Sequence, residues 1–362
     1  MRARAALVAV ALAGCATVVT ERMQRSAQWR GDHFENPPSW PKRSGLGGVL
    51  KWRLTPGVQG RPSGFRPPFV ANDGSVLRDN QGGISITWIG HATTLIQAGG
   101  MSILTDPIFS DRIGGFFKRM APPGVQGWLL PRIDVVVISH NHRDHLDEDS
   151  VLALGPRTTY VVPLGMARWF KQRGLWRVVE LDWWETTEIT GPRGGRAVIT
   201  LVPAQHWSAR GLGDQNKSLW GGYVIDAGGR RFFFGGDTGY PAAFRQIGER
   251  YPDLDYALLP IGAYAPRWFM RPQHMSPEDA AQAFRDLGAR TLIPIHWGTF
   301  HLSDEPMGEP PVRLRAAMGA DADRILQLAI GESWFEPPPT VPEPEPAATD
   351  DTGEPPDAGA SD

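Results

Sequence analysis

One short segment constrains this chain more than any other. Three histidines and an aspartate fall within six residues: His140, His142, Asp144 and His145. They follow the apolar, β-branched run 133–138, which is typical of a buried strand. Alternation along an extended segment places His140 and His142 on one side, and Asp144 and His145 follow at a turn, where they can face a second ion. Imidazole and carboxylate ligands at this density suit a borderline cation such as Zn²⁺, so the segment predicts a metal site.

The same pattern recurs three times further along the chain. A predicted strand over 197–202 leads to His206, one over 231–234 to Asp237, and one over 291–295 to His296. A lone His after a strand is usually an ordinary turn residue, but the recurrence beside the histidine cluster favours metal ligation. Side chains at strand ends are also held more rigidly than side chains on free loops. Two surface helices are expected over 277–287 and 311–318.

This series resembles the ligand set of the metallo-β-lactamase superfamily. The resemblance implies an α/β fold, an αββα four-layer sandwich, with two Zn²⁺ ions at one edge of its sheets. It assigns three ligands to each ion and one bridging residue, and it gives Asp144 a catalytic role next to a bridging water that acts as the nucleophile. Iron and manganese accept the same ligands, so the metal stays open. The implied ligands are His140, His142 and His206 for the first zinc, Asp144, His145 and His296 for the second, and Asp237 as the bridge.

A narrower resemblance extends over nearly the whole body of the chain, roughly 33–334. Many of the matching stretches contain no metal ligand. They resemble the N-acyl-phosphatidylethanolamine-hydrolysing phospholipases D. The resemblance implies cleavage of the phosphodiester between phosphatidic acid and an N-acylethanolamine, by hydroxide that bridges the metals. The matching stretches are 36–40, 87–93, 104–109, 180–185, 214–221, 231–240, 260–270, 273–275 and 295–300.

Four further residues are candidates on the substrate side of the site. His274 is a candidate catalytic or substrate-binding residue, because the resembled family has a His beside the phosphate at this position, with Gln273 as its neighbour; a surface-loop His is the alternative. Arg143 stands where the family carries a Tyr that helps to bind substrate. An Arg there can pair with a phosphate, but it can also signal another head group. His91 either orients a metal ligand or makes a plain turn hydrogen bond.

The N-terminus reads as an export signal. Arg2 and Arg4 precede the apolar run 5–13, which is too short to span a bilayer. The run ends in Leu-Ala-Gly-Cys, which resembles the bacterial lipobox and predicts lipidation of Cys15; a plain secretory signal is the alternative. The prediction places the protein in the bacterial cell envelope, anchored in a membrane at the periplasmic face of the outer membrane. Since Cys15 is the only Cys, the chain forms no disulfide within itself.

Composition divides the rest of the chain. We expect a signal peptide over 1–15, a tether over 16–28, an irregular extension packed on the core over 29–83, and a catalytic domain over 84–335. The stretch 336–362 is rich in Pro and acidic residues and is expected to be a disordered tail. No basic tract of the kind that binds nucleic acid is present. The expected partners are a phospholipid substrate and a membrane surface, and a homodimer stays open.

The leading hypothesis is therefore a dinuclear zinc phosphodiesterase that acts on a phospholipid. A lactonase or another phosphodiesterase of the same fold is the first alternative, because the ligand set alone does not fix the substrate. An envelope lipoprotein without enzymatic activity is the least expected, since such a protein has no need of all seven ligands.

Overall fold

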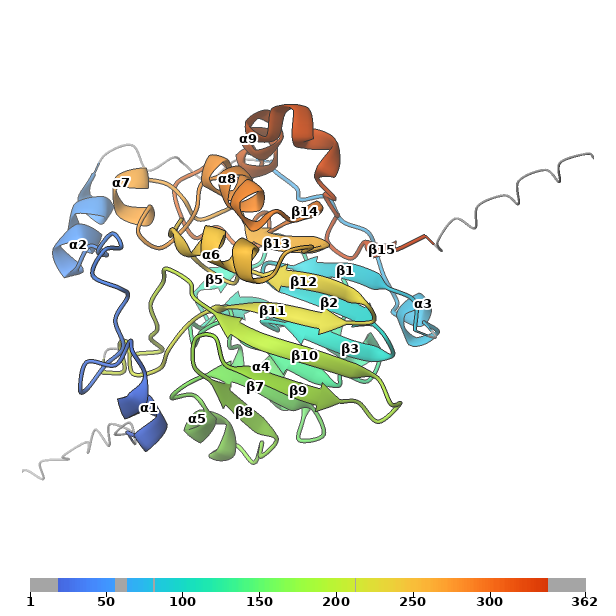
Figure 1. Ribbon diagram of the computed structural model, residues 1–362. Helices are drawn as coiled ribbons and strands as arrows, with labels where there is room; N and C mark the ends of the chain where they lie inside the picture. Colours follow the sequence, from blue (N-terminus) through green and yellow to red (C-terminus); the bar gives the residue numbers. More distant parts are fainter. Residues whose placement is uncertain (1–18, 56–63, 81, 212, 338–362) are drawn as a thin grey trace, which may run out of the picture.

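The structure is a computed structural model that describes residues 19–55, 64–80, 82–211 and 213–337 (Figure 1). The predicted signal peptide, Cys15 and nearly all of the predicted tail lie outside these residues. Among the described residues, none of the helices combines the length and apolar character needed to cross a bilayer.

Two β-sheets pack face to face. The first has seven strands in the order β15-β1-β2-β3-β6-β7-β8, and the second has six in the order β14-β13-β12-β11-β10-β9. The strands of the first sheet are β1 (Ser85–Gly90), β2 (Thr93–Ala98), β3 (Met101–Thr105), β6 (Val135–Val137), β7 (Thr159–Pro163), β8 (Val178–Leu181) and β15 (Ser333–Phe335). Those of the second are β9 (Thr186–Thr190), β10 (Arg196–Val202), β11 (Gly222–Ala227), β12 (Arg230–Phe234), β13 (Tyr256–Pro260) and β14 (Thr291–Ile295). The four strands predicted from the sequence are confirmed as β6, β10, β12 and β14.

Helices cover the outer face of each sheet, which completes four layers and confirms the predicted αββα sandwich (Figure 1). Alternation within β6 shows how the layers form. Val135 and Val137 join the large apolar core between the sheets, whereas Val136 packs outward with Val151 of α4 and Phe170 of α5. The helices are α1 (Glu21–Arg25), α2 (Leu46–Leu54), α3 (Ser75–Arg78), α4 (Glu148–Leu154), α5 (Ala167–Lys171), α6 (Ala243–Arg250), α7 (Arg267–Met270), α8 (Pro277–Leu287) and α9 (Glu309–Met318).

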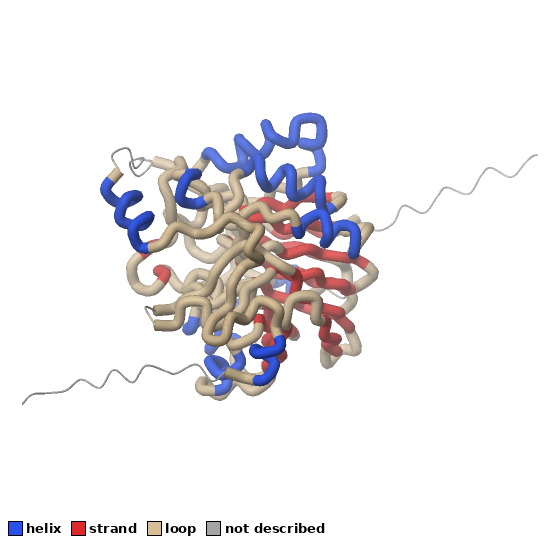
Figure 2. The backbone as a smooth tube through the Cα atoms, turned by 60° about the vertical axis from the view of Figure 1, so that its left-hand side comes forward, coloured by secondary structure: helices blue, strands red, loops and turns tan. Residues whose placement is uncertain are grey.

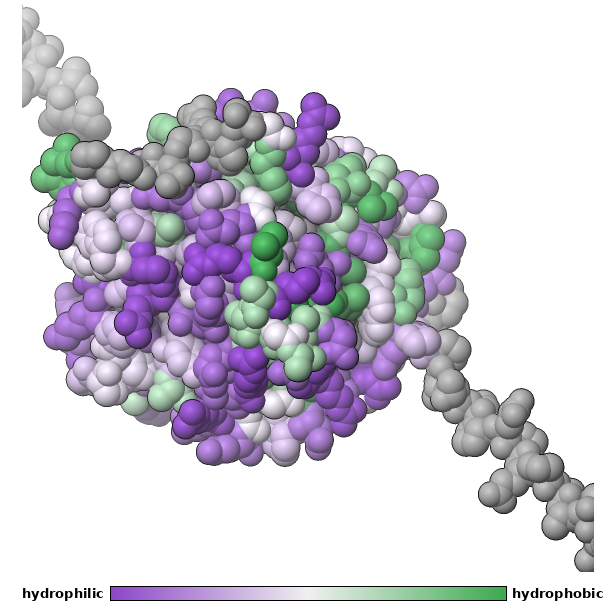
Figure 3. Space-filling view, turned by 90° about the horizontal axis from the view of Figure 1, so that it is seen from above, coloured by the Kyte–Doolittle hydropathy of each residue, from purple (hydrophilic) through white to green (hydrophobic). Residues whose placement is uncertain are grey.

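Helix α8 matches its predicted bounds and begins with a capping box. The Ser276 hydroxyl accepts a hydrogen bond from the Asp279 amide, and the Asp279 carboxylate accepts one from the Ser276 amide. Helix α9 starts two residues earlier than expected, at Glu309. The outer face that carries α8 and α9 is mainly hydrophilic, with apolar side chains only in small groups (Figure 3).

The N-terminal segment contains a helix that the sequence did not indicate. A tether was expected over 16–28, and within it Glu21–Arg25 form helix α1, in which Met23 is fully buried. Burial of a Met side chain contributes roughly 1.5–3 kcal/mol, and the Ser26 hydroxyl adds a hydrogen bond of 3.0 Å to Asp182. The described part of this segment is therefore docked on the domain. The expected irregular extension over 29–83 likewise contains two helices, α2 and α3.

The predicted tail begins with an ordered contact. The Arg230 side chain donates to the Glu336 carboxylate at 2.7 Å, and the Glu336 amide donates to the Ile84 carbonyl at 2.9 Å. Helix α1 and strand β15, which lie near the two ends of the described chain, stand on opposite sides of the molecule (Figure 1).

Candidate active site

The predicted ligands follow the C-terminal ends of four strands. β6 leads to His140, β10 to His206, β12 to Asp237 and β14 to His296. Loops gather along one side of the sandwich, while the strands fill the other (Figure 2). Gly236, with φ of +56°, has no room for a side chain, because a Cβ there would meet the Ser139 Cβ at 2.4 Å. The sequence therefore folds so that side chains far apart along the chain converge at one edge.

Three imidazoles form the first half of the site. The ring nitrogens His140 Nε2 and His142 Nδ1 lie 2.7 Å apart, and His206 Nε2 lies 3.2 Å from the same His142 atom. One ligand atom from each of the three residues lies within 4.8 Å of the others, close enough to hold a single ion. These are the three residues that the resemblance assigned to the first zinc.

The second half contains Asp144, His145 and His296, together with His91. One ligand atom from each of these four residues also lies within 4.8 Å of the others. His91 Nε2 is 3.1 Å from Asp144 Oδ2. This contact supports the interpretation that His91 orients a metal ligand, and not the alternative of a plain turn hydrogen bond. His91 and His296 both adopt left-handed backbone conformations, with φ of 55° and 60°, and the His296 amide donates to the His91 carbonyl at 2.9 Å. Such strain is kept where function requires it.

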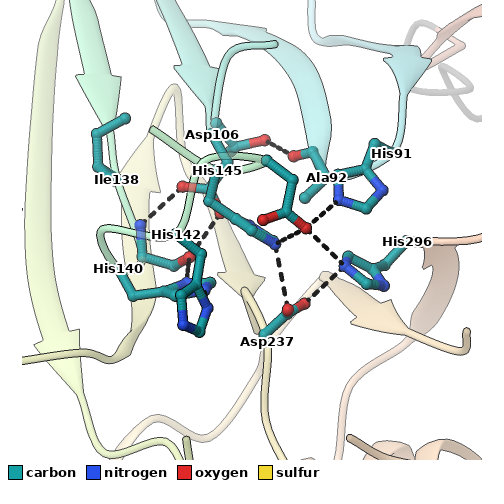
Figure 4. A network of polar contacts seen from close by, with 12 residues as sticks. His91, Ala92, Asp106, Ile138, His140, His142, His145, Asp237 and His296 are labelled. Carbon is teal, nitrogen blue, oxygen red and sulfur yellow. Dashed lines mark hydrogen bonds and ion pairs between the residues drawn. The ribbon is translucent and has the colours of Figure 1, made fainter. Parts of the chain in front are cut away.

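Asp237 faces both halves. Its Oδ2 lies 3.1 Å from His145 Nε2 and 3.9 Å from His206 Nε2, and its Oδ1 lies 3.0 Å from His296 Nε2. His145, His296 and Asp237 point toward one another in the close view (Figure 4). The structure thus brings all seven predicted ligands together, with Asp237 in the position expected of a bridge.

The chemistry of these atoms fits divalent cations. Several buried atoms have no hydrogen-bond partner among the described residues, although unpaired buried nitrogen and oxygen atoms are costly. A cation would satisfy those that face the centre, which are His145 Nε2, Asp237 Oδ1 and His296 Nε2, and imidazole with carboxylate is the donor set that Zn²⁺ accepts. The unpartnered atoms are His142 Nε2, His145 Nε2, Asp237 Oδ1 and both ring nitrogens of His296.

Burial sets the charge of the imidazoles in the first half. It lowers the pKa of His142 to about 4 and holds the pKa values of His140 and His206 well below the ordinary value. The rings are therefore neutral at pH 7 and offer a lone pair to a cation. In contrast, burial alone would raise the pKa of Asp237, but the neighbouring charges of His145 and His296 outweigh it and hold that pKa well below its usual range.

A buried carboxylate behind the site was not singled out from the sequence. Asp106, at the end of β3, accepts hydrogen bonds of 2.6 Å from His145 Nδ1 and from the Ser139 hydroxyl, and one of 2.7 Å from the Ser139 amide. A hydrogen bond to the outer nitrogen fixes the ring of a ligating His and directs Nε2 toward the metal. Asp106 follows an apolar strand, and this position is the one feature of the sequence that could have indicated it.

Arg210 is a second residue that the sequence did not indicate. Its guanidinium donates to the carbonyls of Asn141 at 3.1 Å and Leu146 at 2.6 Å, which are the two ends of the histidine-rich loop. One side chain therefore fixes the loop that carries ligands of both halves. Since its partners are backbone atoms 64 and 69 positions away, no local motif marks it.

The residues predicted on the substrate side lie around the same centre. His274 is partly exposed, and its Nδ1 is buried, unpartnered among the described residues and 3.8 Å from Asp237 Oδ2. The Gln273 carbonyl accepts from His206 Nδ1 at 2.9 Å, so its backbone orients a ligand, whereas its side chain is buried. Arg143 is exposed and lies against Gly114 of the hairpin formed by β4 (Arg112–Ile113) and β5 (Phe117–Lys118).

Comparisons with known proteins agree with this architecture. Residues 102–297 match the Beta-lactamase superfamily domain. N-acyl-phosphatidylethanolamine-hydrolyzing phospholipase D 1 of Caenorhabditis elegans is 37% identical over 336 residues, which cover 84% of this chain and 92% of the relative. The mitochondrial enzyme of the same name from Saccharomyces cerevisiae is 35% identical over 274 residues, covering 72% of this chain and 58% of the relative.

A solved structure shows the same fold. The metallo hydrolase from the archaeon Ignicoccus hospitalis superposes with a TM-score of 0.53 at 21% identity, covering 70% of this chain and 98% of that one. The chain is therefore a metal-dependent hydrolase of the metallo-β-lactamase fold. Within the beta-lactamase superfamily it belongs to the family of the N-acyl-phosphatidylethanolamine-hydrolysing phospholipases D.

Proposed function

We propose that this protein is a dinuclear zinc phosphodiesterase of the phospholipase D type. Its substrate is N-acyl-phosphatidylethanolamine or a related phospholipid, which it cleaves to phosphatidic acid and a head-group alcohol. The single observation that carries the proposal is the placement of Asp237 between two groups of ligands, in a chain 37% identical to a phospholipase D named for that substrate.

Each half of the site has its own task. His140, His142 and His206 would hold one cation with neutral rings, while Asp144, His145 and His296 would hold the other. Two bound cations lower the pKa of a water to make it a nucleophile and neutralise the charge on the phosphoryl oxygens. The protein supplies fixed geometry, because each of these side chains lies in a buried or partly buried position behind rigid strand ends.

His274 and Arg143, at the open side of the site, are suited to bind the phosphate of the substrate. His142, Asp144 and His274 are the partly exposed members of the cluster, so substrate reaches the centre from their side. The pKa of His274 is lowered to about 4 by burial, which leaves the ring neutral and able to donate one N–H to a phosphoryl oxygen. Arg143 is charged and exposed beside Asp144, where a guanidinium can pair with the phosphate of an incoming lipid.

We also propose that the enzyme acts at a membrane surface. The support is the lipobox-like sequence before Cys15, because lipidation of this Cys would anchor the protein in a membrane of the bacterial envelope. The hairpin beside Arg143 presents Phe116, whose exposed fraction is 84%, followed by Phe117 and Lys118. An aromatic tip with a basic neighbour suits the boundary between head groups and acyl chains.

The direct test uses protein of measured metal content and a panel of substrates. Metal-loaded enzyme is expected to release phosphatidic acid from N-acylated phosphatidylethanolamine, and removal of the metal by a chelator should stop the reaction. The substrate assignment is wrong if loaded enzyme leaves this lipid intact while it opens lactones or cleaves thioesters.

The substitution Asp144→Asn tests the second half. The amide lacks the charge that a cation requires, so turnover should fall by roughly 1,000-fold or more, with little change in the thermal unfolding midpoint of the metal-free protein. Asp149→Asn is the matched control, because Asp149 is an exposed acid on the following helix, α4. Full activity in the Asp144 variant would remove this residue from the site.

A further inference from the structure

Within the part of the chain that the structure describes, one cation near the site has no acidic partner. Arg43 lies in the N-terminal extension, and its guanidinium carbon sits 3.7 Å from the centre of the Trp207 ring. It is half-buried, and none of the described carboxylates forms an ion pair with it. Burial lowers the pKa of Arg43, yet an Arg so placed stays charged at neutral pH. A half-buried guanidinium is usually paired with an anion, so the missing partner requires a reason.

The ring beneath this cation packs against a predicted metal ligand. Trp207 follows His206 directly, and its ring meets that of His142 edge to face, with centroids 4.3 Å apart. One aromatic ring therefore separates the charge of Arg43 from the first half of the site. His142 is one of the partly exposed members of the cluster, and the Trp207 ring connects it with Arg43 through two successive ring contacts.

The extension is fixed at this place by its own contacts. The Asn36 side chain donates to the His206 carbonyl at 2.9 Å and accepts from Trp220 Nε1 at 3.2 Å. Trp40 packs on Trp183 with ring centroids 5.8 Å apart. The position of Arg43 is therefore determined by contacts on the same segment, and the guanidinium is held in place before any ligand binds.

We propose that Arg43 is a substrate-binding residue that pairs with the phosphate group of the lipid from the side of the first half. This inference rests on the proposed function for the identity of the lipid. The guanidinium is stacked on Trp207 and forms no hydrogen bond with the residues that the structure describes, so its N–H groups can bind two phosphate oxygens. The N-terminal extension then contributes directly to substrate recognition.

The central experiment measures equilibrium binding together with kinetics. In Arg43→Gln, binding of a short-chain phosphatidic acid, measured by titration calorimetry, should weaken about 10-fold, since one charge-assisted contact is lost. Binding of the matching short-chain diacylglycerol, which lacks the phosphate, should not change. With substrate in neutral detergent micelles, KM should rise by a similar factor and kcat should change less than about twofold.

Two further variants separate recognition from folding. Arg43→Lys keeps the charge but not the planar two-point contact, so its loss should be smaller than that of the Gln variant. Arg53→Gln is the matched control, because Arg53 also stacks on a tryptophan of the extension, Trp52, at 5.0 Å, but it is exposed on α2. It should bind and react like the parent protein.

Two results would overturn the inference. One is phosphatidic acid binding that is equal in the parent protein and in Arg43→Gln. The other is a variant whose only defect is weaker binding to vesicles that contain anionic lipids, because Arg43 would then contact the membrane and not the substrate. Since phosphatidic acid binding needs no turnover, failure of the parent protein to cleave N-acylated lipid would disprove the proposed function and still leave Arg43 testable.

Discussion

The two halves of the site are built from different supports. In the first half, the outer nitrogens face neutral groups: His206 Nδ1 donates to the Gln273 carbonyl at 2.9 Å, and His140 Nδ1 lies 2.8 Å from the Ser139 hydroxyl. In the second half, His145 Nδ1 donates to the buried carboxylate of Asp106. A carboxylate behind a ligating His raises its basicity more than a carbonyl or a hydroxyl does.

The two halves of the site also differ in the charge of their ligands. The first half contains only imidazoles with lowered pKa values, so it presents neutral ligands. The second half has Asp144 and faces Asp106, and these carboxylates, together with Asp237, outweigh burial and raise the pKa of His145 well above its ordinary value. Without a metal, His145 is therefore protonated at neutral pH, and binding of a cation in the second half must release that proton. The comparison teaches that the two sites need not bind their ions equally well.

Among the residues that support the ligands from behind, the largest effect is expected from Asp106, whose carboxylate holds His145. Asp106→Asn should weaken metal binding in the second half about 10- to 100-fold, because His145 loses its charged partner. Equilibrium dialysis followed by metal analysis should show one ion retained at a concentration where the parent protein holds two. Activity should fall with the lost ion and recover when excess metal is added.

A second buried aspartate provides the control for Asp106. Asp134 accepts a hydrogen bond from the Ser102 amide at 3.0 Å and is also buried, but it contacts no predicted ligand. Asp134→Asn should lower stability without changing the metal count. Equal loss of both ions in the Asp106 variant would show that the halves are not independent, which Ser139 would explain, because its hydroxyl contacts both Asp106 and His140.

An intermediate effect is expected from Arg210, which holds the loop that carries ligands of both halves. Arg210→Met removes two hydrogen bonds to the loop that carries His142, Asp144 and His145, so it should weaken both sites by similar factors, a few-fold each. The free energy of unfolding should fall by about 2–3 kcal/mol, since two buried carbonyls lose a charged donor. Chemical denaturation and metal titration measure the two effects. Loss confined to one half would contradict the role of Arg210 as a common support.

The sequence predicted the ligands because metal binding demands particular side chains in particular places. His140 and Asp237 stand shortly after runs with strong β propensity, so strand pattern and ligand chemistry agree at these positions. Asp106 also follows a strand, but a single Asp at a strand end is ordinary, and its partner Ser139 lies 33 positions away. The role of Asp106 therefore became clear only once the fold brought Ser139 and His145 next to it.

The helix in the N-terminal segment was not predicted from the sequence, for a related reason. A helix of five residues with one buried apolar side chain, Met23, has no detectable periodicity, and its contacts to Asp182 and Glu185 are distant in sequence. Arg43 escaped notice in the same way, because its stacking on Trp207 joins two irregular stretches. Composition separates packed from free segments only when the packed ones bury many apolar residues.

The smallest expected effect concerns the open side of the second half. Arg143 is exposed, so its pairing with a phosphate is screened by water, and Arg143→Gln should raise KM only about 2- to 5-fold while leaving kcat and the metal count unchanged. Arg315→Gln on α9 is the control, because it removes the same charge from an exposed position far along the chain. If Arg143 instead selects the head group, Arg143→Tyr, which restores the residue that the family resemblance implies, should change the ratio of kcat/KM values between N-acylated and unmodified phosphatidylethanolamine. An unchanged ratio would assign head-group choice to other residues and leave Arg143 with a purely electrostatic part in recognition.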